Sequence, residues 1–347
     1  MRRFKIGNRT VGEGVLPVII VELGINHNGS LDRAIYLADK AIKAGAEIIK
    51  HQTHIPSDEM THHARKIIPM NAKNNIYDLI AKCSLKEKDE KRLMNYIKSK
   101  KKIFISTPFS RAAADRLAKF NIPAFKIGSG ECNNYPLIEH ICRYKKPIIL
   151  STGMNSISSI KPAVKIIEKK GIPYALLHCT NLYPTPAKLV RLNCMLELKK
   201  KFPKAVIGLS DHTINNYSSY AALGLGASIV EKHYTDTKKR KGPDISASMD
   251  KKEFKNLLNA SKTIFENLKS SKTKQALKEE KTTIKFAFAS VVSIKEIKKG
   301  EKFTKKNIWV KRPGIGRYLA KDFSKILNKK AARNIKVDNF INKGDIK

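Results

Sequence analysis

The stretch from Val206 to Thr235 sets the tightest limit on the fold. Two short apolar runs, Val206–Leu209 and Ser228–Val230, flank a segment rich in glycine and alanine. Each run ends in a polar cluster, Ser210 to Thr213 in one case and Glu231 to Tyr234 in the other. This order predicts strand, helix, strand. If the two strands are parallel neighbours in a barrel, both clusters lie at the same carboxyl-terminal rim, where barrel enzymes place their reacting groups.

The same unit recurs in the preceding part of the chain. We expect further strands at Pro17–Gly24, Glu47–Thr53, Ile103–Pro108, Ala124–Glu131, Pro147–Gly153 and Tyr174–Thr180. Amphipathic stretches predict helices, among them Leu31–Ala44, Ala112–Phe120, Ile157–Lys170, Val190–Lys201 and Phe254–Leu268. Eight strands alternating with helices favour a closed (β/α)8 TIM barrel, an α/β fold, over an open doubly wound sheet. No GxGxxG motif follows the first strand, which also weakens a dinucleotide-binding interpretation.

The composition changes after the barrel. Lys269–Lys285 is polar and charged like a linker, and Phe286–Lys347 holds short apolar pieces separated by turns rich in glycine, proline and lysine. We therefore predict a barrel domain over residues 1–268, a linker over 269–285 and a small domain over 286–347. Because about 60 residues bury little apolar surface, we expect the small domain to dock on another surface.

The formal net charge of +39 raises the question of a nucleic-acid partner. The lysines that dominate it are scattered over turns and helix faces without interleaved aromatic residues, so solvated surfaces are favoured and no nucleic acid is expected. Attraction of anionic substrates stays open. No apolar run approaches the ~20 residues of a membrane span, and the amino terminus lacks a signal-peptide pattern. We expect a cytoplasmic protein without a membrane partner, and five cysteines without a CxxC pair suit reduced thiols.

Polar side chains at the carboxyl ends of the predicted strands form the candidate site. They include Glu22, Lys50, Gln52, Thr107, Lys126, Ser129, Glu131, Ser151, Asn181, Tyr183, Ser210, His212 and His233. A lysine in an apolar strand is costly to bury without a partner, so Lys50 and Lys126 favour a bound phosphate or carboxylate, with nearby serines as neutral donors. The alternative is that each lysine pairs with an internal carboxylate such as Glu22 or Glu131.

A pair of histidines and a long connecting stretch at the rim also suggest functions. His212 and His233 can converge on one ion, although two histidines satisfied by ordinary hydrogen bonds would give the same pattern. The irregular stretch Ile55–Ile76 is long for a connection between a strand and a helix. We expect it to cover the substrate at this rim.

The motifs at these strand ends resemble a known family. They are VELGINHNG at 21–29, KHQT at 50–53, STPF at 106–109, KIGSGE at 126–131, LSTGM at 150–154, GLSDH at 208–212 and EKH at 231–233. In this order and spacing they resemble the bacterial N-acetylneuraminate (sialic acid) synthases. The tail motifs FAFAS at 286–290 and WVKRPG at 309–314 resemble the small domain, similar to type III antifreeze protein (SAF domain), that ends these synthases.

The resemblance implies an activity, namely condensation of phosphoenolpyruvate with N-acetylmannosamine and water. The products would be N-acetylneuraminate and phosphate, released by cleavage of a C–O bond. Sibling synthases that make legionaminic or pseudaminic acid from other sugars are the alternative. The stretches HQTH at 51–54 and YPTP at 183–186 look more like the sialic acid group.

The resemblance also implies a role for each site residue. Phosphoenolpyruvate would be held by Lys50, Lys126, Ser129, Ser151 and Ser210, with Thr107 and Asn181 nearby; the sugar would meet Glu22, Gln52, Tyr183 and Asp244. Glu22, Lys50, Lys126 and Glu131 would be the catalytic residues, with Glu131 near the attacking water. His212 and His233 would bind Mn²⁺ or Mg²⁺. Arg312 would reach from the small domain of one chain into the barrel of its partner, in a domain-swapped homodimer.

Overall fold

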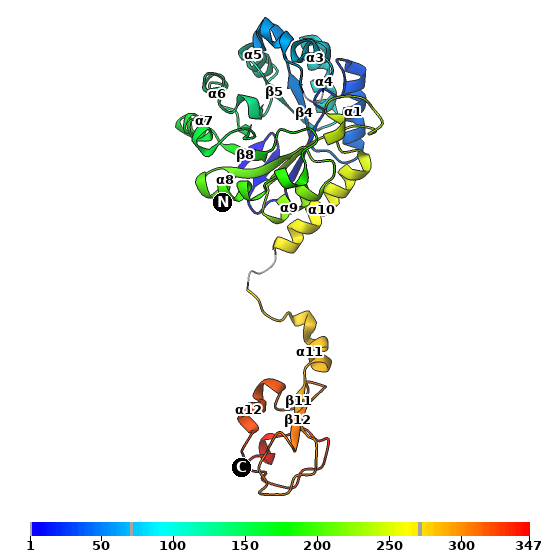
Figure 1. Ribbon diagram of the computed structural model, residues 1–347, viewed down its shortest axis with the longest axis vertical. Helices are drawn as coiled ribbons and strands as arrows, with labels where there is room; N and C mark the ends of the chain where they lie inside the picture. The colour runs from blue at the N-terminus through cyan, green and yellow to red at the C-terminus, as the bar shows by residue number, and fades with distance from the viewer. Residues whose placement is uncertain (1, 70–71, 270–272) are drawn as a thin grey trace. The chain divides into compact units, whose positions relative to one another are not determined.

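The computed structural model describes residues 2–69, 72–269 and 273–347. The chain divides into two compact units, Met1–Ser270 and Ser271–Lys347. The first unit carries the predicted barrel and the second carries the predicted small domain (Figure 1). Within the described residues, no helix combines the length and the apolar character that crossing a membrane requires.

Eight parallel strands close into a barrel in the first unit. They are β3 (Val18–Glu22), β4 (Ile48–Thr53), β5 (Ile103–Pro108), β6 (Phe125–Ile127), β7 (Ile148–Ser151), β8 (Tyr174–Cys179), β9 (Val206–Asp211) and β10 (Ile229–His233). Each pairs with the next, and β10 closes the ring against β3. The TIM-barrel prediction is confirmed. The fourth predicted strand is shorter than expected, because Ser129–Glu131 turn away as the 3-10 helix η2.

Helices surround the strands, as Figure 1 shows. They are α1 (Leu31–Lys43), α4 (Glu87–Ser99), α5 (Arg111–Lys119), α6 (Tyr135–Cys142), α7 (Ile157–Lys169), α8 (Asn193–Lys201), α9 (Tyr217–Gly224) and α10 (Lys251–Lys269). Helix α1 shows why they form: the Ser30 side chain caps its first turn by accepting from the Arg33 amide, and Ala34, Leu37, Ala38 and Ala41 bury one face. The predicted helix from Val190 begins only at Asn193, after the short 3-10 helix η3 (Ala187–Leu189).

The long connection after β4 contains short helices. They are α2 (Pro56–Glu59), η1 (His62–Lys66) and α3 (Ile76–Cys83). The Asp58 carboxylate accepts from the Ala112 amide over 2.9 Å, which ties α2 to the start of α5. Residues 70 and 71 of this stretch lie outside the described residues, and a role in covering substrate stays a prediction.

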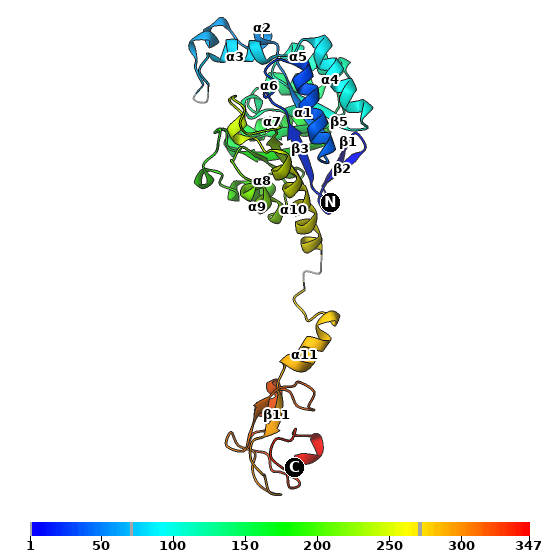
Figure 2. The same ribbon diagram turned by 90° about the vertical axis from the view of Figure 1, so that its right-hand side faces the viewer.

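A β-hairpin precedes the barrel, where the sequence suggested only a polar lead-in. Strands β1 (Arg3–Ile6) and β2 (Arg9–Gly12) pair antiparallel. Phe4, Ile6 and Val11 pack in one cluster with residues at the amino ends of the barrel strands, including Val18 and Val206. The hairpin therefore closes the floor of the barrel, opposite the end that carries α2 and α3 (Figure 2). Strand β1 alternates exposed and buried residues over only four positions and β2 does not alternate, so the pattern is too short to predict a strand.

The second unit has its own small core. Its elements are η5 (Lys278–Glu280), α11 (Lys281–Ala287), β11 (Ser290–Ser293), β12 (Ile308–Lys311), η6 (Ala320–Asp322), α12 (Phe323–Ile326) and η7 (Lys343–Asp345). The core includes Val291, Ile297, Phe303 and Ile308. On its surface Trp309 meets the ring of Phe323 edge to face, with centroids 5.4 Å apart. Helix η5 and the first five residues of α11 fall within residues 269–285, the stretch predicted as a linker, of which residues 270–272 lie outside the described residues.

Candidate active site

A polar cavity of about 120 Å³ lies at the carboxyl ends of the strands. It is lined by the predicted residues Glu22, Lys50, Gln52, Thr107, Lys126, Ser129, Ser151, Asn181, Tyr183, Ser210, His212 and His233, and also by Phe109, Cys179 and Glu231. Parallel strands end at one rim, so residues spread over two hundred positions meet here. The structure therefore brings together most of the side chains that the sequence singled out.

The two strand lysines are buried and face carboxylates. Lys50 forms an ion pair with Glu22 and donates to Thr107 Oγ1 over 3.2 Å. Lys126 donates to Ser151 Oγ over 2.7 Å and to the backbone carbonyl of Ile127 over 3.0 Å. Lys50 thus makes the internal pair with Glu22 that the sequence left open as an alternative. Burial lowers the pKa of Lys50 to about 8, so the ammonium is easier to deprotonate than an exposed one.

Glu231 is the site residue that sequence reasoning passed over. One of its carboxylate oxygens lies 3.8 Å from Lys50 Nζ and 3.6 Å from Lys126 Nζ, and it accepts from Ser210 over 3.2 Å. Burial alone would raise the pKa of Glu231, but Lys126 and Lys50 outweigh it and hold the pKa below its usual value. The signal was available, because side chains alternate along a strand and an inward His233 places Glu231 inward too.

His212 and His233 lie side by side, with ring centroids 5.5 Å apart. His212 Nδ1 donates to the backbone carbonyl of Thr180 over 3.0 Å, so Nε2 is the ring nitrogen left to bind an ion. His233 Nδ1 is buried without a hydrogen bond, and burial lowers the pKa of this imidazole, so the ring is neutral. Neutral imidazoles with an open nitrogen are good ligands for a divalent ion, and the donor set fits one.

The donor set is also incomplete for a closed metal site. Among residues 2–69, 72–269 and 273–347, no group of three or more His, Cys, Asp or Glu side chains is arranged to hold an ion. Water or substrate oxygens would have to complete the coordination sphere of an ion on the two histidines. Such a site suits an exchangeable Mn²⁺ or Mg²⁺ better than a structural zinc.

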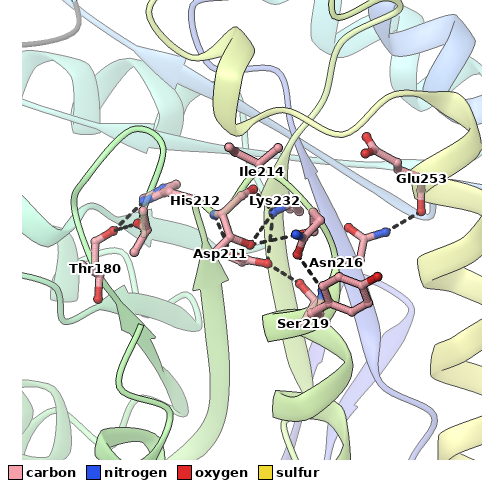
Figure 3. A network of polar contacts seen from close by, with 12 residues as sticks. Thr180, Asp211, His212, Ile214, Asn216, Ser219, Lys232 and Glu253 are labelled. Carbon is pink, nitrogen blue, oxygen red and sulfur yellow. Dashed lines mark hydrogen bonds and ion pairs between the residues drawn. The ribbon is translucent and has the colours of Figure 1, made fainter. Parts of the chain in front are cut away.

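A buried ion pair between Asp211 and Lys232 lies beside His212 (Figure 3). Lys232 and Asp211 are paired in register on β10 and β9, and Lys232 Nζ lies 3.0 Å from Asp211 Oδ2. Lys232 also donates to the Thr213 carbonyl over 2.6 Å, and Ser219 Oγ of α9 donates to Asp211 over 2.6 Å. Since each partner directly precedes one histidine, this pair fixes the two strand ends that carry them.

Tyr183 and Asp244 complete the wall around the histidines. The Tyr183 ring stacks on His212 with centroids 4.1 Å apart. Asp244 lies before the 3-10 helix η4 (Ile245–Ala247), with Oδ2 3.5 Å from His233 Nδ1. Gly24 has a φ of +51°, and a Cβ there would lie 2.7 Å from this same Asp244 oxygen. Only glycine allows so close an approach.

Three predicted residues do not line the cavity: Asp244, which lies behind His233, and also Glu131 and Arg312. Glu131 is on η2, accepts from Asn134 over 2.6 Å and lines a neighbouring hollow of about 650 Å³ together with Asp58 and Glu59. Burial raises the pKa of Glu131. Arg312 belongs to the second unit, where its side chain is exposed. The roles expected for all three residues stay predictions.

Comparison with known proteins places this geometry in a family. The model of the NeuB family matches residues 37–273, and that of the SAF domain matches residues 288–347. The chain belongs to the NeuB family. It is 37% identical to an N,N'-diacetyllegionaminic acid synthase of Campylobacter jejuni, over 93% of this chain and 98% of the relative. It is 32% identical to a pseudaminic acid synthase of the same species, over 98% of this chain and 99% of the relative.

A solved structure extends the likeness to three dimensions. The N-acetylneuraminic acid (sialic acid) synthetase of Leptospira borgpetersenii, crystallised with citrate, superposes with a TM-score of 0.74 at 29% identity. The match covers 81% of this chain and 95% of that chain. The NeuB-family barrel followed by an SAF domain is thus the architecture expected from the sequence motifs.

Proposed function

We propose that this NeuB-family chain is an N-acetylneuraminate synthase. It would condense phosphoenolpyruvate with N-acetylmannosamine and water to give N-acetylneuraminate and phosphate. The observation that carries the proposal is the pair of buried lysines among serine and threonine hydroxyls in the rim cavity. Two ammonium groups with neutral donors match a small anion that carries both a phosphate and a carboxylate.

The residues of the cavity have roles that follow from their chemistry. Lys50 and Lys126, with Ser129, Ser151, Ser210, Thr107 and Asn181, would bind phosphoenolpyruvate and stabilise the charge that builds on the departing phosphate. Binding the anion would draw both ammonium groups from the carboxylates of Glu22 and Glu231. Glu22, Gln52, Tyr183 and Asp244 would orient the open-chain sugar, so that its aldehyde carbon faces C3 of phosphoenolpyruvate.

The bonding changes balance without an outside reagent. C3 of phosphoenolpyruvate would attack the aldehyde carbon, the aldehyde oxygen would take up a proton, and C2 would gain cationic character. Water would add at C2 and give up a proton; Glu131 is the proposed base, and to act it would have to turn from the neighbouring hollow toward the cavity. The tetrahedral species would then lose phosphate by cleavage of its C2–O bond. A divalent Mn²⁺ or Mg²⁺ on His212 and His233 would supply Lewis-acid polarisation of the sugar carbonyl.

A sibling activity is the second candidate. The relatives named for legionaminic and pseudaminic acid align over almost the whole chain, and a change of sugar needs only a change in the wall of the cavity. The HQTH and YPTP stretches are the features that favour N-acetylmannosamine.

One assay separates these candidates. The purified full chain would be mixed with phosphoenolpyruvate, Mn²⁺ and one sugar at a time: N-acetylmannosamine, the 6-deoxy acetamido sugars of the sibling pathways, or N-acetylglucosamine. We expect phosphate release that requires both substrates and is fastest with N-acetylmannosamine. Faster release with a 6-deoxy sugar would reassign the substrate, and no release with any sugar would contradict synthase activity.

A further inference from the structure

His54 links Gln52, which lines the cavity, to a carboxylate outside it. The residue follows β4 and is 6% exposed. Its Nδ1 lies 3.1 Å and 2.9 Å from the two carboxylate oxygens of Glu59 on α2. Its Nε2 lies 3.1 Å from Oε1 of Gln52. The three side chains form a line from the connecting segment into the site.

The partners fix the protons on the ring. An ionised carboxylate can only accept a hydrogen bond, so Nδ1 must carry a proton. Gln52 Oε1 is a carbonyl oxygen and also only accepts, so Nε2 must carry a second proton. Both contacts are satisfied at once only by an imidazolium. The ring also stacks on Phe109, with centroids 4.2 Å apart and planes 13° apart, and an aromatic face favours a cation.

The contact with His54 fixes the orientation of the Gln52 amide group. With its carbonyl oxygen held by His54, the amide group presents its NH₂ as the free end, and this NH₂ can only donate. We infer that His54, charged and held by Glu59, is a positioning residue that makes Gln52 a hydrogen-bond donor to the sugar. The sugar would meet this donor with an acceptor oxygen, from a hydroxyl or from the N-acyl carbonyl. The inference rests on the proposed function and specifies one contact of its sugar site.

The first test does not depend on activity. Long-range ¹H–¹⁵N spectra of the full chain with labelled histidine would report the protons on each ring, with the His54 signals assigned from His54→Phe. We expect both nitrogens of His54 to be protonated at neutral pH, and Glu59→Gln to remove one of the two protons. A neutral His54 ring in the wild-type chain would overturn the inference whatever the enzyme acts on.

The second test is kinetic. His54→Phe keeps a ring to stack on Phe109 but loses both donors, and its matched control is Tyr36→Phe, at an exposed residue of α1 outside the connecting segment. We expect His54→Phe to raise KM for the sugar about 10- to 100-fold, with KM for phosphoenolpyruvate changed less than about twofold. The control should leave both unchanged. Equal loss of both affinities in a His54→Phe chain that keeps the wild-type circular dichroism spectrum would contradict the positioning role.

A double mutant decides whether His54 acts through Gln52. If it does, His54→Phe combined with Gln52→Ala should bind sugar no more weakly than Gln52→Ala alone. Additive losses would overturn the inference while leaving the synthase assignment intact. Absence of phosphate release from the wild-type chain with every sugar would instead sink the proposed function, and the spectra would still decide the state of His54.

Discussion

Lys50 and Lys126 place two ammonium groups in a buried cavity that also holds Glu22 and Glu231. The four charges offset one another in the absence of a ligand, which makes the cavity tolerable inside the fold. The same balance means that an incoming anion competes with the protein's own carboxylates. The protonation state of the two lysines therefore governs how strongly the cavity binds the anion.

The lowered pKa of Lys50 makes anion binding depend on pH. Burial lowers the pKa to about 8, so Lys50 is cationic below that pH and loses its charge as the pH rises through it. We expect kcat/KM for phosphoenolpyruvate to fall above about pH 8, approaching tenfold for each further unit. Lys50→Arg, whose side chain stays charged to above pH ~12, should shift this fall upward. An identical alkaline fall in Lys50→Arg would exclude Lys50 as its source.

Substitution of either lysine tests anion binding directly. Lys50→Met and Lys126→Met remove one charge each while keeping the apolar stem, and both should raise KM for phosphoenolpyruvate more than KM for the sugar. Steady-state kinetics with each substrate varied in turn provide the measurement. An unchanged KM for phosphoenolpyruvate in both variants would mean that the lysines serve only their internal ion pairs.

The two histidines carry the prediction for the metal. His212→Ala and His233→Ala should each weaken Mn²⁺ binding at least about tenfold, because each removes one of two protein ligands. Calorimetric titration with Mn²⁺ alone measures this without substrates, with His62→Ala as the control. EDTA-sensitive turnover at a near-normal rate in either variant would show that the ion is held elsewhere.

At the scale of elements, the Asp211–Lys232 pair locks β9 to β10 and both strands to α9. Lys232→Met should destabilise the barrel by roughly 3–5 kcal/mol, because it leaves the carboxylate of Asp211 buried without its cation. Urea unfolding followed by far-UV circular dichroism measures the loss. The double variant with Asp211→Leu should recover much of it, since no buried charge then remains. A double variant as unstable as Lys232→Met would contradict a charge-based cause.

The barrel was predictable from sequence because each strand is an apolar run that stops at a polar cluster. That signal located the strands to within a few residues, including Val206–Asp211 and Ile229–His233. The hairpin Arg3–Gly12 was missed because half of its strand residues are not buried and its strands are four residues long. The hairpin packs against barrel strands that lie far along the chain, and the local sequence pattern carries no information about such contacts.

Most site residues could be predicted from the sequence, because they lie at the carboxyl ends of parallel strands and these ends converge. Position alone could not say which carboxylate faces Lys126, and the structure shows Glu231 there while Glu131 turns into a neighbouring hollow. The difference arises because β6 ends at Ile127 and the chain bends at Gly128 into η2, which carries Glu131. A turn of this kind redirects a side chain without changing the motif that contains it.

At the scale of the whole molecule, Arg312 belongs to the second unit and not to the barrel on which it is expected to act. We expect it to act on the barrel of a partner chain, and a heterodimer of the wild type with an Arg312→Ala/His212→Ala chain tests this. If the arginine works in trans, each barrel carries one lesion and the heterodimer is inactive. Heterodimers that keep about half of the wild-type activity would show that it works in cis.

The control for this mixing experiment is a heterodimer of the wild type with a His212→Ala chain. It keeps one intact barrel and both arginines, so it should retain about half of the activity under either arrangement. Differential affinity tags isolate the mixed species in both cases. An inactive control would show that the two barrels depend on one another and would require a different test.

Trp309 gives the chain an optical property that follows from its position. It is the single tryptophan, it lies on β12 of the second unit, and it is half exposed beside Phe323, three residues before Arg312. Light absorbed selectively by tryptophan is therefore emitted from the SAF domain alone, and the barrel is dark at that wavelength. A change in this emission when phosphoenolpyruvate and sugar are added would be a label-free signal that an event in the barrel has reached the other domain.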